Sequence, residues 1–136
     1  MMNYLRLLYA NLVLLLLAVP AYGNLPQQLN LEFNTLTNRD GLSNGQVNCI
    51  LQDNRGYMWF ATQSGLNRYD GFRFKNFFNK NLDEKTIPNN SVDDIQQDWK
   101  GNLWIHTSAG YCIYQYDKET FDRHPEKWLS SVGVNG

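Results

Sequence analysis

Short runs in which apolar and polar residues alternate recur along the chain after residue 40, and turns rich in Gly and Asp separate them. A period of two over runs of this length predicts β-strands. The first set of runs covers residues 47–52, 57–62, 66–69 and 72–77. Because only short turns join these runs, neighbouring strands must pair antiparallel, and the set predicts a four-stranded meander.

The same pattern returns at an offset of 45 residues. The second set of runs covers residues 92–97, 102–107, 111–116 and 121–124. Asp53, Gly56 and Trp59 return as Asp98, Gly101 and Trp104. Repeats of this length, with four strands in each copy, are typical of the blades of a β-propeller. The predicted fold is all-β, with two propeller blades and an incomplete ring.

Turn residues support the strand boundaries. An Asp at the first and a Gly at the fourth position of 53–56 and of 98–101 suit a type I turn that a left-handed glycine closes. Asp70-Gly71 is a signal for a two-residue hairpin. The second copy carries a longer turn at this point, over residues 117–120, so the difference in length falls outside the strands.

A further strand is expected over residues 31–37, where β-branched and apolar residues partly alternate. An N-terminal strand can close a propeller by pairing with strands from the other end of the chain. The expected organisation is a signal peptide, a closing strand with linker, two blades and the truncated start of a next repeat, over residues 1–23, 24–40, 41–78, 79–124 and 125–136.

The first 23 residues resemble a targeting segment. Arg6 precedes an apolar run over residues 7–19, and small residues at 21 and 23 suit a signal peptidase. A cleaved secretory signal is the favoured interpretation. A membrane anchor is the alternative, although the run is shorter than the roughly 20 residues that span a bilayer. No second apolar run follows, so no other membrane span is expected.

Charge and cysteine content narrow the function classes. With 12 basic and 13 acidic residues, the chain lacks the basic surplus of a nucleic-acid-binding protein. Export would permit a disulfide between Cys49 and Cys112, but these lie at non-equivalent positions of the two copies, so two buried thiols are the favoured interpretation. No Cys or His cluster suits a metal, and no cofactor is expected.

Aromatic and titratable residues are the candidates for a functional site. Trp59 and Trp104 occupy matching positions and are expected in the core, with an aromatic platform for a sugar ring or a flat cofactor as the alternative. Trp99 and Trp128 have no counterpart and are better candidates for exposed contacts. For His106 a packed, hydrogen-bonded role is favoured over a catalytic base, and His124 is expected to be exposed. For Asp93, Asp94 and Asp98 a structural role is favoured over a general acid–base pair or a calcium site. No catalytic, metal-binding or cofactor-binding residue is predicted.

Several motifs together resemble the two-component regulator propeller repeat. They are Gly41-Leu42-Ser43-Asn44, Val47-Asn48-Cys49-Ile50-Leu51-Gln52-Asp53, Gly56-Tyr57-Met58-Trp59-Phe60-Ala61-Thr62 and Gly65-Leu66-Asn67-Arg68-Tyr69-Asp70-Gly71. The resemblance covers about residues 31–124. The second copy departs from it at His106, which replaces a small residue, and at Gly110-Tyr111-Cys112, which replaces Gly65-Leu66-Asn67.

This resemblance implies the periplasmic sensor region of a hybrid two-component histidine kinase, exported and responsive to an oligosaccharide that binds the complete propeller. It also implies homodimers of the full-length relatives, and it does not select ligand-binding residues. Two alternatives remain at this point: the start of a secreted propeller enzyme acting on carbohydrate, and a gene fragment without independent function. The chain itself contains no kinase motif.

Overall fold

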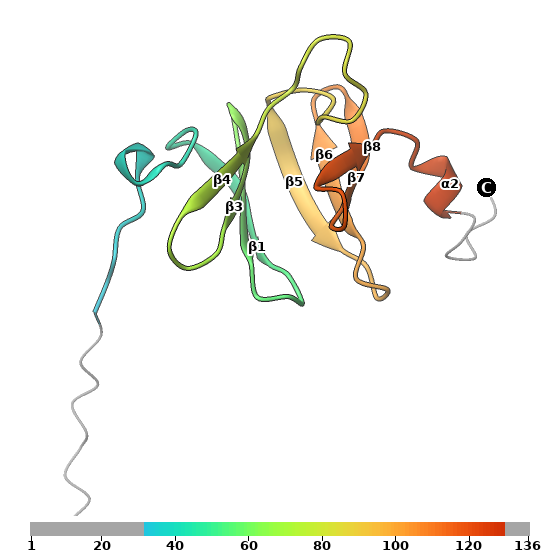
Figure 1. Cartoon of the computed structure of the whole chain (residues 1–136). Helices are drawn as coiled ribbons and strands as arrows, with labels where there is room; N and C mark the ends of the chain where they lie inside the picture. The colour runs from blue at the N-terminus through green and yellow to red at the C-terminus, as the bar shows by residue number, and fades with distance from the viewer. Residues whose placement is uncertain (1–31, 130–136) are drawn as a thin grey trace, which may run out of the picture. The chain divides into compact units, whose positions relative to one another are not determined.

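The computed structural model describes residues 32–129, and these form two four-stranded antiparallel sheets (Figure 1). We call the sheets blade 1 and blade 2. Blade 1 contains β1 (Val47–Gln52), β2 (Met58–Thr62), β3 (Gly65–Tyr69) and β4 (Phe74–Phe77). Blade 2 contains β5 (Val92–Gln97), β6 (Leu103–Thr107), β7 (Gly110–Gln115) and β8 (Thr120–Asp122). Strands are ordered in each sheet as along the chain, which confirms the predicted pair of meanders.

The predicted boundaries of β1 and β5 agree with the structure at both ends, whereas the other strands differ by one to two residues. The largest differences are at the outer strands. In blade 1, Asp70 Oδ1 accepts the backbone N–H groups of Phe72 and Arg73 at 2.9 and 2.8 Å. These hydrogen bonds keep Phe72 and Arg73 in the turn, so β4 starts at Phe74 instead of residue 72.

The two Asp-to-Gly turns have the predicted geometry. Gly56 and Gly101 have φ of 88° and 86°, in the left-handed region that favours glycine. Their N–H groups donate to the carbonyls of Asp53 and Asp98 at 3.0 and 2.9 Å. The equivalence of the two copies therefore extends to the backbone of their turns.

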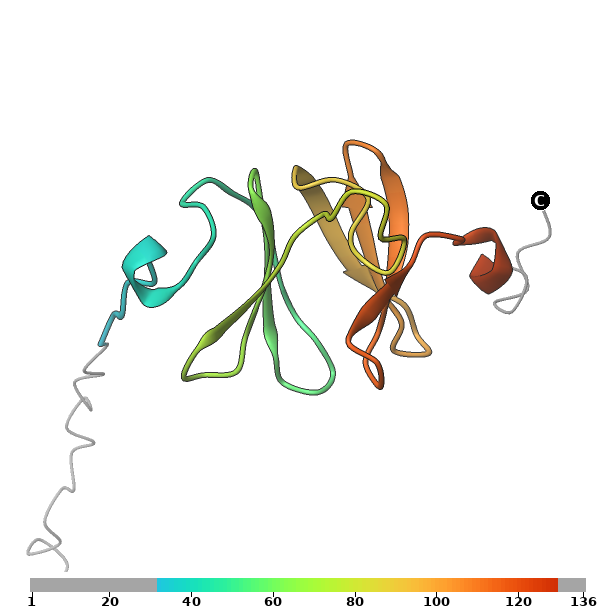
Figure 2. The same ribbon diagram turned by 45° about the horizontal axis from the view of Figure 1, so that its top comes forward.

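Figure 2 shows the two blades from a second direction. An apolar core of buried side chains lies between them. Trp59 is fully buried there, and its ring makes an edge contact with Tyr114 of blade 2 at 4.9 Å between centroids. This confirms the predicted core role of Trp59. Cys49 and Cys112 are free thiols, the first half-buried and the second buried.

Residues 32–37 form no strand, so the expected closing strand over residues 31–37 is wrong for its described part. A strand requires a hydrogen-bonded neighbour. Here the chain instead turns into a short 3-10 helix, η1 (Asn38–Asp40). Thr37 caps this helix, and the Asp40 carboxylate accepts the Thr37 N–H at 2.8 Å in return.

The expected signal peptide over residues 1–23 lies outside the described residues. Within residues 32–129, no helix combines the length and apolar character needed to cross a membrane. The expected start of a next repeat, from residue 125, contains the short helix α2 (Glu126–Leu129) in its described part.

Candidate functional site

The two blades carry different chemistry at equivalent positions of one sheet face, which we call the forward face. In blade 1 this face belongs to the core between the blades. Its equivalent residues in the two copies are Cys49, Leu51, Trp59, Ala61 and Leu66 in blade 1, and Asp94, Gln96, Trp104, His106 and Tyr111 in blade 2. Only the tryptophan is retained, and each of the other four positions changes from an apolar to a polar or amphipathic residue.

The forward face of blade 2 is turned away from blade 1. Ile95, Ile105 and Cys112 of blade 2 pack into the shared core. Because side chains alternate along a strand, the intervening residues project from the opposite face of the sheet. There the five forward-face residues line a hollow of about 90 Å³. We call this the blade 2 hollow.

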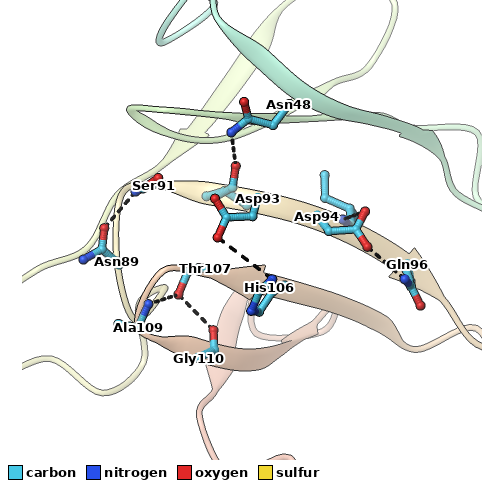
Figure 3. Close-up of polar contacts among 12 residues, drawn as sticks. Asn48, Asn89, Ser91, Asp93, Asp94, Gln96, His106, Thr107, Ala109 and Gly110 are labelled. Atoms are coloured by element: carbon cyan, nitrogen blue, oxygen red, sulfur yellow. Dashed lines mark hydrogen bonds and ion pairs between the residues drawn. The ribbon is translucent and has the colours of Figure 1, made fainter.

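His106 and Tyr111 form the aromatic side of the hollow. Their rings stack with centroids 4.3 Å apart and planes inclined by 26°. His106 Nδ1 lies 3.9 Å from Asp93 Oδ2, an ion pair whenever the imidazole is protonated (Figure 3). Tyr111 remains 53% exposed. The Tyr111 ring is therefore in contact with solvent among the described residues.

Asp94 and Gln96 supply the polar side of the hollow. Gln96 Nε2 donates to Asp94 Oδ2 at 2.8 Å (Figure 3). The Ile95 N–H donates to Asp94 Oδ1 at 2.9 Å. Partial burial opposes ionisation of Asp94, but these bonds and one from the Cys49 thiol lower the pKa of its carboxyl below the ordinary value. The hollow therefore presents an ionised acceptor at neutral pH.

A β-bulge places Asp93 beside this hollow. The register of β5 against β6 shifts between Val92 and Asp94, and the register of β1 shifts at the equivalent point around Asn48. Such a bulge turns one side chain out of the regular alternation. Asn48 uses this position to donate to the Val92 carbonyl at 2.7 Å, across the two blades. Asp93 uses it to approach His106.

Trp104 is positioned by the turn that precedes its strand. Its indole Nε1 donates to Asp98 Oδ2 at 3.0 Å, as Trp59 Nε1 donates to Asp53 Oδ2 at 2.7 Å. This bond explains why Asp and Trp keep the same spacing in both copies. Trp104 is half-buried and borders the hollow, so its predicted place in a closed core is not realised within the described residues.

The other sequence candidates lie elsewhere. Trp99 is 79% exposed at a turn, as expected for a residue available for contact. Trp128 is half-buried, and its indole donates to Asp122 at 3.1 Å. His124 is exposed beside Glu126. Asp98 serves its turn, where Oδ1 accepts two backbone N–H groups at 2.9 Å each.

Gln96 is not recognisable as a site residue from the sequence alone, and Tyr111 stands out there only as a departure from the repeat. The available signal was the change of chemistry between the copies, from Leu51 to Gln96 and from Leu66 to Tyr111. That signal becomes interpretable once the structure shows that the blade 1 residues are covered and the blade 2 residues line a hollow.

Comparison with known proteins agrees with the blade architecture. Residues 41–64 match the model of the two component regulator propeller family. A histidine kinase from Formosa agariphila is 41% identical over 61 residues, which are 45% of this chain and 4% of that protein. A crystal structure of the extracellular domain of a hybrid two component system from B. thetaiotaomicron is 34% identical, with a TM-score of 0.61.

That structural match covers 66% of this chain and 13% of the other, so the chain spans a small part of each relative. The sequence, the family model and the fold together confirm the resemblance to the two-component regulator propeller repeat. The fold of residues 32–129 is all-β, and residues 41–64 match the model of this repeat.

Proposed function

We propose that the chain supplies two blades of an extracellular, ligand-sensing propeller in a hybrid two-component signalling protein, and that the ligand is an oligosaccharide. One observation carries the proposal. The blade pair matches an extracellular domain of a hybrid two component system in both sequence and fold, at 34% identity and a TM-score of 0.61. An extracellular region of a signalling protein is placed to meet ligands outside the membrane.

The proposal includes a non-catalytic role. Catalysis requires a nucleophile or an acid–base pair that converges on one point. In the blade 2 hollow Gln96 donates to Asp94 and His106 Nδ1 lies 3.9 Å from Asp93, and the residues that line the hollow include no Ser or Cys nucleophile. Such an arrangement suits reversible hydrogen bonding to a ligand.

Gene deletion tests the proposal in the organism that encodes the chain. The wild type and the deletion strain are grown on a series of single oligosaccharides, and transcripts are sequenced after each transfer. We expect the deletion to abolish the transcriptional response to one class of oligosaccharide and to leave the others unchanged. Responses that are identical in both strains for every sugar contradict a sensor of this type.

A further inference from the structure

We propose that Asn44 is a site of spontaneous covalent modification, at which the backbone nitrogen of Gly45 attacks the side-chain amide and displaces ammonia. Among the described residues, Asn44-Gly45 is the one Asn-Gly pair. It lies in the loop that leads into β1, where Asn44 is half-buried and Gly45 is exposed. This chemistry does not depend on the proposed function.

The reaction needs water as its one co-reactant. The Gly45 nitrogen forms a bond to Cγ of Asn44, the bond between Cγ and Nδ2 breaks, and the proton lost from Gly45 is balanced by one gained from solvent on the leaving ammonia. The product is a five-membered cyclic imide. Water then cleaves the new bond to give an ordinary aspartate, or the original peptide bond to give isoaspartate, in which the main chain runs through Cβ and Cγ.

The side chain of Asn44 is held in an arrangement that favours this attack. The Gln46 N–H donates to Asn44 Oδ1 at 2.7 Å, an Asx turn that bends the side chain toward the Gly45 peptide. Negative charge develops on Oδ1 as the nitrogen adds to Cγ, and the same N–H stabilises this charge. Asn44 Nδ2, the leaving group, is positioned by its hydrogen bond to Ser64 Oγ at 3.2 Å.

The attacking nitrogen is available. The Gly45 N–H makes no hydrogen bond to any residue in the range 32–129. Gly45 has no Cβ to obstruct the approach, and its backbone can rotate more freely than that of any other residue type. Both reacting groups therefore meet within one loop of the chain.

The second copy of the repeat provides a matched comparison. Asn89 is equivalent to Asn44, and its Oδ1 accepts the Ser91 N–H at 2.8 Å in the same kind of turn. The next residue is Asn90 instead of a glycine, and its Oδ1 accepts the Asn79 N–H at 2.7 Å. The side chain and its hydrogen bond restrict rotation of the peptide between Asn89 and Asn90. We therefore expect Asn89 to react more slowly.

A blade packed behind blade 1 would leave the attacking nitrogen of Gly45 available. Blade 1 itself has this position relative to the second copy, where the Gly65 N–H donates to the Asn90 carbonyl at 2.7 Å. That contact uses a carbonyl oxygen, and the Asn90 N–H still makes no hydrogen bond within the described part of the chain. The equivalent contact in the first copy would use the Gly45 carbonyl.

The two products should affect the loop differently. The carboxylate of an aspartate at position 44 still accepts the Gln46 N–H, and the Ser64 hydroxyl can donate to it. Isoaspartate lengthens the main chain by one carbon and removes the Asx turn. The insertion lies beside Ser43, whose N–H joins the loop to β3 through Asn67 Oδ1 at 2.8 Å. We expect the isoaspartate form to melt at a lower temperature than the aspartate form.

Incubation of the full-length protein at pH 8 and 37 °C tests the inference. Samples taken over several weeks are digested, and the peptides are analysed by mass spectrometry after chromatography that separates aspartate from isoaspartate. We expect both products at position 44, formed at least about tenfold faster than any product at Asn89 in the same sample.

Two variants exchange the residue after each asparagine. A Cβ at Gly45 would meet only Asn38 Oδ1, at 3.4 Å, so the fold should accept Gly45→Ala, and we expect it to slow conversion of Asn44 at least about fivefold. Asn90→Gly creates the reactive pair in the second copy and should speed conversion of Asn89, with Asn44 unchanged as the internal control.

Three results would overturn the proposal. Conversion of Asn44 that is no faster than that of Asn89 removes the special reactivity of the pair. An unchanged rate in Gly45→Ala shows that the Gly45 nitrogen does not limit the reaction. Aspartate without any isoaspartate shows direct hydrolysis of the amide by water, which excludes the cyclic imide.

Discussion

The phenol of Tyr116 in blade 2 donates a hydrogen bond to the carboxylate of Asp53 in blade 1, with 2.8 Å between the oxygens. The same carboxylate oxygen accepts the indole of Trp59. Asp53 is almost fully buried, so its carboxylate oxygens need these hydrogen-bond donors in place of water. One side chain therefore closes the turn of its own repeat, positions the central tryptophan and joins the next blade.

Removing the hydroxyl of Tyr116 tests how strongly this bond joins the blades. We expect Tyr116→Phe to lower the free energy of unfolding by about 1–3 kcal/mol, because a buried acceptor loses a donor. Urea unfolding followed by tryptophan fluorescence measures the change. Tyr69→Phe is the control, since its hydroxyl donates to the Gly71 carbonyl at an exposed position of one blade. Equal losses in the two variants contradict a special role for Tyr116.

The glycines that begin β3 and β7 provide a matched pair for a steric prediction. Gly65 and Gly110 have similar φ of 124° and 116°. A Cβ at Gly65 would lie 2.8 Å from the Phe78 ring and 3.1 Å from the Phe77 carbonyl oxygen, whereas one at Gly110 meets nothing within 4 Å. Both alanine variants share the backbone strain, and only Gly65→Ala adds a clash.

We expect Gly65→Ala to be less stable than Gly110→Ala by at least about 1 kcal/mol, the low end for overpacking. Thermal unfolding of both variants and the wild type measures this difference. If the two variants melt at the same temperature, the close approach of Phe78 to the β3 turn is not present in solution.

The thiols of Cys49 and Cys112 should react with a labelling reagent at different rates. Burial raises the pKa of the Cys112 thiol to about 12. Burial also raises the pKa of Cys49, which is only half-buried. Because the folded pKa of Cys112 lies above its unfolded value of about 8.5, its contribution to stability is complete below that pH and is lost as the pH rises toward 12.

Thiol labelling at pH 8 with Ellman's reagent measures the difference in single-cysteine variants. In Cys49→Ser, where Cys112 remains, we expect labelling to be as slow as unfolding. In Cys112→Ser, we expect the remaining Cys49 to react faster. Rapid labelling of Cys112 in the folded protein would contradict its burial between the blades.

Glu119 forms a charged contact between the blades. Its carboxylate pairs with Lys75 and, at 2.8 Å, with Arg68, both in blade 1. Hydrogen bonds from Lys75 and then Arg68 lower the pKa of Glu119. The resulting stability is present above the unfolded pKa of about 4.3 and is lost as the pH falls through the lower folded value.

We therefore expect Glu119→Gln to be less stable than the wild type at pH 7 and to show a smaller loss on acidification below about pH 4.3. Salt should reduce the difference, because the contact is partly exposed. Glu84→Gln, in the connection between the blades, is the control for loss of one negative charge. Parallel pH profiles for Glu119→Gln and wild type would rule out this contact as a source of stability.

The sequence predicts the blades well because each turn and strand is encoded locally. Asp53, Gly56 and their copies determine where hairpins reverse, and alternation determines which face is apolar. The segment 32–37 has the local pattern of a strand but forms none, because a strand also needs a partner. The blade 2 hollow could not be predicted from the sequence, because Gln96 and Tyr111 stand out only when the structure shows that the equivalent Leu51 and Leu66 are covered.

The central claim is that this propeller region binds an oligosaccharide and does not transform it. Isothermal titration calorimetry of the full-length protein tests this most directly. The ligand is the oligosaccharide to which the wild type responds in transcription and the deletion strain does not. We predict a saturable isotherm in which each injection returns to the baseline. Heat flow that persists after each injection, as turnover produces, or the absence of any binding heat at saturating ligand would contradict it.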